Sequence, residues 1–329
     1  MATPLRARLP GLGVLVGVAV LAHLAGVALP GVSPLAVAIA AGALLGNVVG
    51  VPDWAAPGVS LHKLALETGI VLLGARLALD EVLVSGPVVA GLAVATVGVG
   101  LLSVETLSRT LLPLDRETGS VLAGGASVCG VSAAAAVAGG IEAAESKLAY
   151  VAGTILLFDA VTLVAFPAAG HALGLSQRAF GVWAGLSMFS TGPVAAAGVA
   201  YGSVAVRWAT LTKLVRNACI GVVAVGYSLH YASGDDADRR LATVWSGFPK
   251  FLVGFLAVAA VANAGLLSVG GLSLLDRAGD WLFAVAFAGL GFDIRVAEMR
   301  SAGLRPVAVV FVHLLLVSAL ALAAVWTLL

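Results

Sequence analysis

Long apolar stretches separated by short polar connections make up most of the chain. Eleven such stretches can be counted, and each is close to the roughly 20 residues that a helix needs to cross a bilayer. The pattern predicts an all-α polytopic membrane protein with about eleven transmembrane segments. The segments cover residues 11–29, 33–50, 63–81, 87–108, 118–140, 147–170, 179–201, 208–231, 248–268, 276–293 and 305–328.

The composition agrees with this pattern. The 329-residue chain is 60% hydrophobic and 11% charged, with a mean hydropathy of +1.08, whereas soluble domains carry about 25% charged residues. A net charge of +1 without a basic run gives no reason to expect nucleic acid as a partner. The two cysteines and five histidines form no disulfide or metal-binding motif, and no nucleotide-binding motif is present. We therefore expect no metal and no other cofactor.

The positive charges predict an orientation. If the N-terminus is cytoplasmic, twelve Lys and Arg residues fall in cytoplasmic connections and only Lys147, Arg207 and Arg277 fall in outer ones. Cytoplasmic connections are normally the ones rich in Lys and Arg. We expect a multi-pass protein of the cell membrane with its N-terminus cytoplasmic and its C-terminus outside. The first segment is interpreted as a membrane helix and not as a signal peptide, because its apolar run is rather long for one.

An internal similarity suggests inverted repeats. Gly74–Val94 resembles Gly291–Phe311: in both, a helix ends at glycine, and a charged stretch, a proline and a valine-rich helix follow. The copies lie seven segments apart and would have opposite orientations, which is typical of secondary transporters. The alternative is a coincidence between two ordinary helix–loop–helix turns. The repeat halves of the single transporter domain 1–329 would cover about 1–170 and 171–329.

The stretch Ala123–Gly140, AGGASVCGVSAAAAVAGG, is a poor helix former inside a predicted transmembrane segment. Each glycine costs a helix roughly 1 kcal/mol relative to alanine, and irregular backbone survives at membrane depth only inside protein or beside a cavity. Close packing through small residues would explain the alanines, but not the cluster of hydroxyls, a thiol and a hinge. We predict an interruption near Gly130 and half of a solute site. This half comprises Ser127, Cys129, Gly130 and Ser132.

The segment 179–201 repeats this layout 60 residues later. GLS at 185–187 corresponds to GAS at 125–127, and both stretches end in alanine-rich sequence. Pro193 lacks a backbone donor and clashes with the preceding turn, which predicts a break near 190–193. The second half of the solute site comprises Ser187, Ser190 and Thr191.

Several charged residues lie within predicted membrane segments, where charges are costly and usually functional, and three of them are candidates for the solute site. Lys213 and Arg216 lie three residues apart on one helix face and are candidates to attract an anion, unless they extend to the membrane surface. Free N–H groups at the start of a half-helix also favour an anion. Asp159 is either a carrier of a proton or sodium ion or, slightly favoured, a structural partner of these cations.

These motifs resemble a known family. SVCGVSAAAA at 127–136 is similar to the SICGxSAIAA signature of the YeiH-type membrane proteins, which are often labelled sulfate exporters. GVWAG at 181–185, VAAAG at 194–198, KLVR at 213–216 and LLGARLAL at 72–79 follow the family's order. The family is grouped with cation/proton antiporters and anion transporters. The resemblance implies an elevator-type fold with a core domain, a panel domain and two crossed broken helices.

The chain departs from the family pattern in the second broken segment. The family usually continues S-I-H-[DE]-x-x-Q-V, whereas this chain has SMFSTGPV at 187–194. A proton-coupled mechanism therefore cannot use that histidine, acid or glutamine here. The segment count also gives both broken segments the same orientation, although crossed half-helices run antiparallel. Either a segment is miscounted or one of the two is a re-entrant hairpin.

The leading prediction is a secondary transporter of a small anion by alternating access, with sulfate-like or sulfonate-like solutes implied by the resemblance alone. The alternatives are a sodium- or proton-coupled carrier of an organic acid and an anion channel. A membrane enzyme is disfavoured, because Cys129 has no candidate base. The expected partners are the anion, a sodium ion or proton and the lipid bilayer, and a homodimer is left open.

Overall fold

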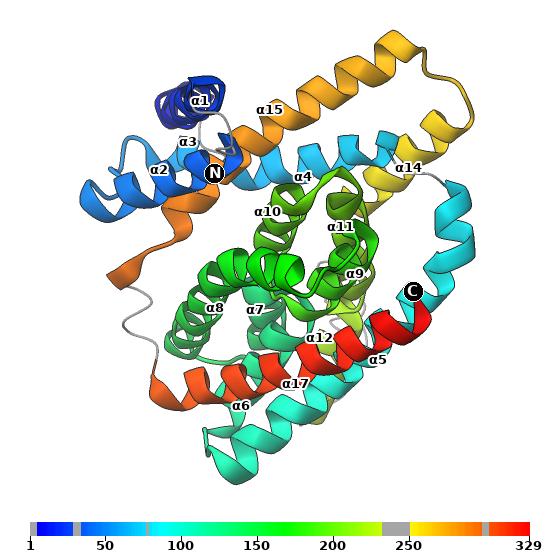
Figure 1. Ribbon diagram of the computed structural model, residues 1–329. Coiled ribbons are helices and arrows are strands. Elements are labelled where there is room, and N and C mark those ends of the chain that lie inside the picture. The colour runs from blue at the N-terminus through cyan, green and yellow to red at the C-terminus, as the bar shows by residue number, and fades with distance from the viewer. Residues whose placement is uncertain (1–4, 29–33, 77–78, 232–250, 298–302) are drawn as a thin grey trace. The chain divides into compact units, whose positions relative to one another are not determined.

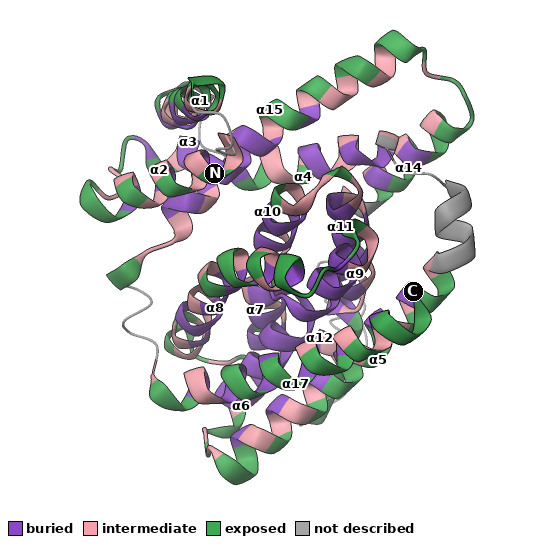
Figure 2. Ribbon diagram, in the orientation of Figure 1, coloured by how far each residue is buried: buried purple, intermediate pink, exposed green. Residues whose placement is uncertain are grey.

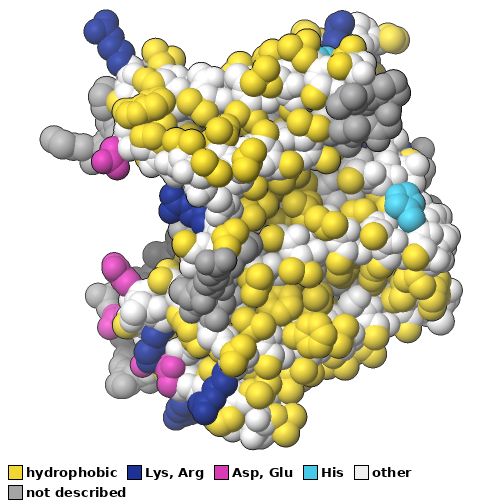
Figure 3. Space-filling model, turned by 60° about the vertical axis from the view of Figure 1, so that its left-hand side comes forward, with side chains coloured by type: hydrophobic (Ala, Val, Ile, Leu, Met, Phe, Trp, Pro, Cys, Tyr) yellow, Lys and Arg dark blue, Asp and Glu magenta, His cyan; other side chains and the backbone are white. Residues whose placement is uncertain are grey.

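A computed structural model of the chain describes residues 5–28, 34–76, 79–231, 251–297 and 303–329 (Figure 1). Every regular element in these ranges is a helix. Six helical stretches among them are long and apolar enough to cross a membrane. The chain is therefore a polytopic membrane protein that is all-helical in the described ranges, and the count of eleven crossing segments stays a prediction. Hydrophobic side chains cover much of the face shown in Figure 3, as expected of a surface that meets lipid.

The helices form two compact units that interleave along the sequence. The first unit comprises residues 1–82 and 250–297, and the second comprises 83–249 and 298–329. The predicted repeat halves 1–170 and 171–329 are contiguous and do not follow this division. The similarity between Gly74–Val94 and Gly291–Phe311 includes positions outside the described residues and stays a prediction.

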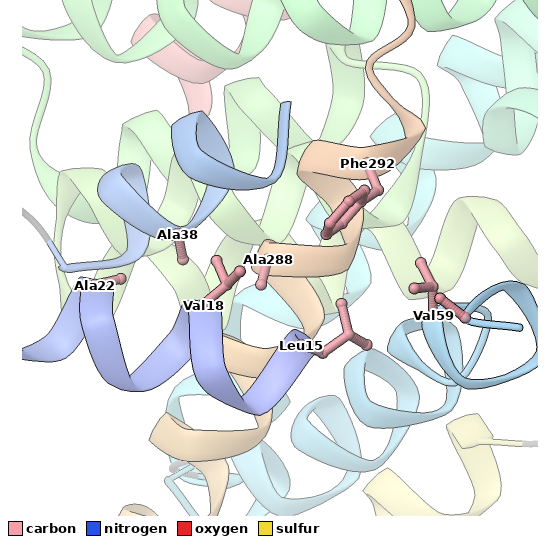
Figure 4. Close-up of a cluster of buried hydrophobic side chains, with 8 residues drawn as sticks. Leu15, Val18, Ala22, Ala38, Val59, Ala288 and Phe292 are labelled. Atoms are coloured by element: carbon pink, nitrogen blue, oxygen red, sulfur yellow. The ribbon is translucent and has the colours of Figure 1, made fainter. Parts of the chain in front are cut away.

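The first unit is a bundle in which α15 packs against α2 and α4. Its core joins α1, α2 and α15 through side chains that Figure 4 shows, among them Leu15, Val18 and Phe292. A Cβ added to Gly42 would lie 2.1 Å from the carbonyl oxygen of Ala288, so small residues permit this close approach. The helices are α1 (Leu5–Ala28), α2 (Pro34–Val48), α3 (Ala56–Val59), α4 (His62–Leu73), the 3-10 turn Gly74–Arg76, α14 (Phe251–Asn263) and α15 (Val269–Asp293).

The second unit contains both segments for which the sequence predicts a break. Their helices are among the most buried in the chain (Figure 2). The helices of this unit are α5 (Leu79–Thr106), whose first residues belong to the first unit, the π turn Leu107–Leu111, α6 (Arg116–Gly124), the π turn Gly125–Cys129, α7 (Gly130–Gly140), α8 (Glu145–Ala172), α9 (Gln177–Ser187), α10 (Thr191–Tyr201), α11 (Ser203–Ala218), α12 (Ile220–Tyr231) and α17 (Leu304–Leu328).

Residues 116–140 fold back on themselves. A straight helix of these 25 residues would be about 37 Å long. Yet Lys147, which follows the end of the segment, forms an ion pair of 2.8 Å with Asp115, which precedes its start. A Cβ added to Gly124 would lie 2.6 Å from the Val137 side chain, so α6 and α7 lie side by side. We call this stretch hairpin 1.

The open end of hairpin 1 is held by charges. Lys147 also pairs with Glu117 at 3.0 Å, and Asp115 accepts the N–H of Thr118 at the start of α6. Partial burial would raise the pKa of Asp115, but the hydrogen bonds from Lys147 and Thr118 outweigh it and hold the pKa below its usual value. These contacts fix both legs of the hairpin to the start of α8.

The turn of hairpin 1 occurs at Gly130, where the sequence predicted an interruption. Gly130 has a φ of +57°, a conformation that other residues rarely adopt. A Cβ at this position would lie 2.0 Å from Oγ of Ser190, so glycine is required for both reasons. We call residues 127–130 tip 1.

Residues 177–201 form a second hairpin. The hydroxyl of Tyr201 donates to the carbonyl of Leu175 at 2.6 Å, and its ring stacks on Phe180 with centroids 3.8 Å apart. The end of α10 therefore lies beside the start of α9. The turn falls on residues 188–190, ahead of Pro193, which occupies the first turn of α10 where a missing N–H costs little. We call this stretch hairpin 2 and residues 188–191 tip 2.

The two hairpins lie at opposite ends of α8. Lys147 in the first turn of α8 contacts the base of hairpin 1. His171 in the last turn stacks on Tyr201 at the base of hairpin 2, with ring centroids 4.3 Å apart. The 28 residues of α8 give a length of about 42 Å, which separates the two bases.

The α11–α12 pair also runs from the base of one hairpin to the base of the other, but it starts at hairpin 2 and ends at hairpin 1. At the start of α11, the N–H of Val204 donates to the side chain of Gln177 in hairpin 2 at 2.9 Å. At the end of α12, the hydroxyl of Tyr231 lies 3.0 Å from Oγ of Ser120 in hairpin 1. The hairpins therefore point toward each other, although the segment count gave them one orientation.

This geometry corrects the prediction that 118–140 and 179–201 each cross the membrane. The two ends of each segment lie together, so each is a re-entrant hairpin and not a crossing. Removing these two from the eleven predicted crossings leaves nine, which is again an odd number. The expectation that the two termini lie on opposite sides of the membrane is therefore unchanged.

We predict that Gly130→Ala destabilises the folded protein by about 2 kcal/mol or more. A non-glycine residue at this φ costs about 1–3 kcal/mol, and crowding against Ser190 adds to this cost. Gly139→Ala is the matched control in the same helix, since nothing lies within 4 Å of its added Cβ. It should stabilise the helix by up to about 1 kcal/mol. Thermal unfolding in detergent measures both, and equal midpoints for the two variants would contradict the tight turn.

Candidate functional site

The two tips meet midway between the two hairpin bases. Sγ of Cys129 lies 3.4 Å from Oγ1 of Thr191, and Gly130 contacts Ser190. The side-chain amide of Asn217 on α11 donates to the same Thr191 oxygen at 2.9 Å. The starts of α7 and α10 are therefore brought together at one point.

The start of a helix carries backbone N–H groups that have no acceptor within the helix. In α10, Val194 donates its N–H to the Ser190 carbonyl at 3.2 Å, so the first N–H groups belong to Thr191 and Gly192. The aligned peptide dipoles add about half a positive charge at each helix start. Two such starts at one point favour an anion.

Lys213 caps the opposite, carbonyl ends of the broken helices. Its side chain is 0% exposed, and Nζ donates to the carbonyl oxygens of Val128 at 2.9 Å, Met188 at 3.2 Å and Phe189. An ammonium group has three hydrogens, so all its donors are committed to tips 1 and 2. The membrane-surface alternative for Lys213 is therefore wrong.

Arg216 performs the same role one turn further along α11. It is 1% exposed, and Nη1 donates to the carbonyls of Gly185 (3.0 Å) and Met188 (2.8 Å), while Nη2 donates to that of Ser127 (2.8 Å). The guanidinium thus connects the end of α9 in hairpin 2 to the π turn that ends the first half of hairpin 1. The two cations thus tie the tips together and contribute positive charge beside them.

Asp159 lies near the middle of α8 and is 5% exposed. Oδ1 accepts the backbone N–H of Ser190 at 3.0 Å, and Oδ2 accepts the Ser190 hydroxyl. No ion pair joins it to Lys213 or Arg216, both of which the structure describes. The carboxylate is therefore hydrogen-bonded to tip 2, while the charge of Lys213 acts on it from a greater distance, so both the structural alternative and the carrier alternative stay predictions.

The predicted hydroxyls divide into two groups. Ser127 and Ser187 are buried, and their Oγ atoms have no hydrogen-bond partner. Ser190 and Thr191 are half-buried and Ser132 is exposed. Each of the two helix starts therefore carries accessible hydroxyls, Ser132 on α7 and Ser190 and Thr191 at the start of α10, and we call these three residues the tip face.

Sequence reasoning missed two buried polar residues at the tips, Asn217 and His313. His313 on α17 is 1% exposed, its Nδ1 lies 2.9 Å from Oγ of Ser103, and its ring centroid lies 6.3 Å from that of Phe189. The available signal was a histidine inside a strongly apolar segment, which usually marks a functional position. Asn217 directly follows Arg216 and could have been noted with it.

No group of three or more His, Cys, Asp or Glu side chains that could hold a metal ion occurs in the described part of the chain. The tips offer N–H and hydroxyl groups on their accessible face, and cations behind it. This arrangement suits a small anion better than a metal ion.

Comparison with known proteins identifies the family. The family model described as conserved hypothetical protein 698 matches residues 10–310. Two UPF0324 membrane proteins of Nitratidesulfovibrio vulgaris are 34% identical over 77% of this chain and 71% of their own, and 32% identical over 82% and 49%. The chain thus spans about half the length of the latter. A UPF0324 membrane protein of Bacillus cereus is 28% identical over 82% of this chain and 79% of its own.

No solved structure matches the chain. The family match covers most of its length, and it includes both hairpins and the helices that hold their tips. The chain therefore belongs to the conserved hypothetical protein 698 family, that is, the YeiH/UPF0324 membrane proteins.

Proposed function

We propose that this protein is a secondary transporter that binds a small anion at the tip face. The observation that carries this proposal is the meeting of two helix starts, from hairpins that point toward each other, beside two buried cations. Each helix start favours negative charge. Within the tips, Lys213 and Arg216 against Asp159 leave one positive charge in excess, which a bound anion would offset.

The donors available to the anion are neutral. The hydrogens of Lys213 are committed to carbonyls and Arg216 is buried, so the cations act on the anion through their electrostatic potential and not by contact. The N–H groups of Thr191 and Gly192, with the hydroxyls of Ser132, Ser190 and Thr191, provide the direct contacts. Neutral donors bind an oxyanion without a direct countercharge, which suits a carrier that must release it again.

Opposed hairpins also favour a carrier over a channel or an enzyme. Each tip is connected to its own end of α8, so movement at either end can expose the shared site to that side. We infer that the second unit is the moving core of an elevator-type carrier and the first unit is its panel. Sulfate-like or sulfonate-like solutes remain our proposal from the resemblance, with sodium coupling and a homodimer as further expectations.

The positive-inside count still favours a cytoplasmic N-terminus. With two re-entrant hairpins, Lys147 moves to the cytoplasmic side and Arg178 to the outer side, so the excess of twelve against three is retained. Hairpin 1 would then open toward the cytoplasm and hairpin 2 toward the outside.

The proposal predicts that a small oxyanion raises the thermal unfolding midpoint of the purified protein. A ligand that binds only the folded state stabilises it by about 2.7 kcal/mol at 100 times its Kd. The screen compares sulfate, methanesulfonate and a dicarboxylate, each with and without sodium, against chloride. A dicarboxylate response that needs sodium would favour the organic-acid carrier instead. No response to any anion would contradict the proposal.

Thr191→Val should weaken anion binding about tenfold, or about 1.4 kcal/mol. The Thr191 oxygen accepts a hydrogen bond from Asn217, so its own hydrogen can turn from Sγ of Cys129, 3.4 Å away, to an anion at the tip face. Thr162→Val is the matched control, because that hydroxyl donates only to carbonyls of its own helix. Titration calorimetry measures both, and equal affinities would remove Thr191 from the site.

Lys213→Met should cost about 2 kcal/mol of folding free energy or more, because the buried carbonyls of Val128 and Phe189 lose their donor at about 1–3 kcal/mol each, whereas the Met188 carbonyl keeps Arg216. Arg207→Met is the control on the same helix, since Arg207 is only partly buried. Chemical or thermal unfolding compares the two variants. A loss no greater than that of the control would show that Lys213 does not hold the tips.

A further inference from the structure

We propose that a proton binds at Asp159 together with the anion, and that this proton converts Ser190 into a hydrogen-bond donor to the anion. The inference rests on the anion site proposed above and adds its coupling partner. It assigns to Asp159 and Ser190 a single switch that connects α8 to tip 2.

The direction of the hydrogen bonds is the first step. An ionised carboxylate can only accept hydrogen bonds. Both the N–H and the O–H of Ser190 are within reach of Asp159, so both donate to it. A hydroxyl has a single hydrogen. While Asp159 is ionised, Ser190 therefore offers only lone pairs to the tip face, and lone pairs repel an anion.

Protonation reverses one of these two bonds. A proton from solvent adds to Oδ2 of Asp159, and the new O–H donates to Oγ of Ser190. Oδ1 continues to accept the Ser190 N–H, so tip 2 keeps its attachment to α8. The hydroxyl hydrogen of Ser190 is released from Asp159. It can then turn to an anion at the start of α7, because the Ser190 oxygen lies against Gly130, the first residue of that helix. No other bond is formed or broken.

The charge of the site changes in the same direction. Protonation removes the single negative charge at the tips, so the potential of Lys213 and Arg216 acts on the anion without opposition. Proton binding and anion binding then favour each other, and this coupling is reciprocal. As the pH falls through the range in which Asp159 takes up its proton, anion affinity should rise by up to tenfold per pH unit.

Other ionisable groups packed around the tips do not provide this connection. Lys213 and Arg216 on α11 donate to carbonyls, and His313 on α17 contacts Ser103, the backbone of Ala126 and the ring of Phe189 but none of the three tip-face residues. Cys129 on hairpin 1 faces Thr191. Among the described ionisable residues, only Asp159 has a hydrogen bond to a tip-face hydroxyl, that of Ser190, whose direction protonation can reverse.

The test is titration calorimetry of the purified full chain with potassium sulfate across a pH series. At each pH, two buffers with different heats of ionisation report the number of protons taken up per anion. We expect uptake approaching one proton per sulfate on the alkaline side of the transition, and tighter binding at acid pH. The same titrations are carried out on Asp159→Asn, Ser190→Ala and the exposed acid control Glu67→Gln.

Asp159→Asn should bind sulfate with little pH dependence and without proton uptake, because the amide donates to Ser190 as the protonated acid would. Ser190→Ala should weaken binding about tenfold at acid pH and reduce the ratio of acid to alkaline affinity. Glu67→Gln should behave like the parent protein. If Asp159→Asn fails to fold, the reduced ratio in Ser190→Ala tests the switch on its own.

The outcomes separate this inference from the proposed function. Sulfate binding without proton uptake, or with unchanged proton uptake in Asp159→Asn, would overturn the inference and leave the anion site standing. An unreduced affinity ratio in Ser190→Ala would also overturn it. If the parent protein binds no sulfate at any pH, the sulfate-like proposal fails and the inference fails with it.

Discussion

The capping of broken helix ends inside a membrane is the constraint on which the second unit depends. Every carbonyl freed where a helix stops must find a donor, because lipid supplies none. Lys213 and Arg216 supply these donors to tips 1 and 2 from a single helix. The cost of burying two charges is offset because each is surrounded by the negative ends of peptide dipoles. Without this arrangement neither hairpin could end at membrane depth.

Each break has a side with free carbonyl groups and a side with free N–H groups. The carbonyl sides are buried, and Lys213 and Arg216 donate hydrogen bonds to them. The N–H sides at Thr191 and Ser132 remain accessible. In the proposed site, capping and binding therefore use different groups. A cation that bound the solute directly would have to release the carbonyls that hold the tips together, so the proposed contacts to the solute come from neutral groups.

Much of this site could be predicted from the sequence, because its signals are local. A glycine-rich run with hydroxyls predicted the break at Gly130, and a proline predicted the second break within a few residues. Lys213, Arg216 and Asp159 were identified because charges are rare in apolar segments. The partners of the two cations were not, since a backbone carbonyl leaves no mark in the sequence.

The fold-back of the hairpins could not be predicted from hydropathy. A hairpin of two 11-residue helices and a single crossing helix have the same length and composition, and only contacts between their ends distinguish them. The charges of Asp115 and Lys147 at the two ends of hairpin 1 were visible but could not be paired without a fold. The similarity between GAS at 125–127 and GLS at 185–187 was the better clue. Its 60-residue period equals one hairpin, which does not cross the membrane, followed by one helix, which crosses it once. One crossing places the second copy on the opposite side of the membrane, so the second copy is inverted relative to the first. Once the fold-back is known, counting crossings per repeat, and not apolar segments, yields the opposed tips.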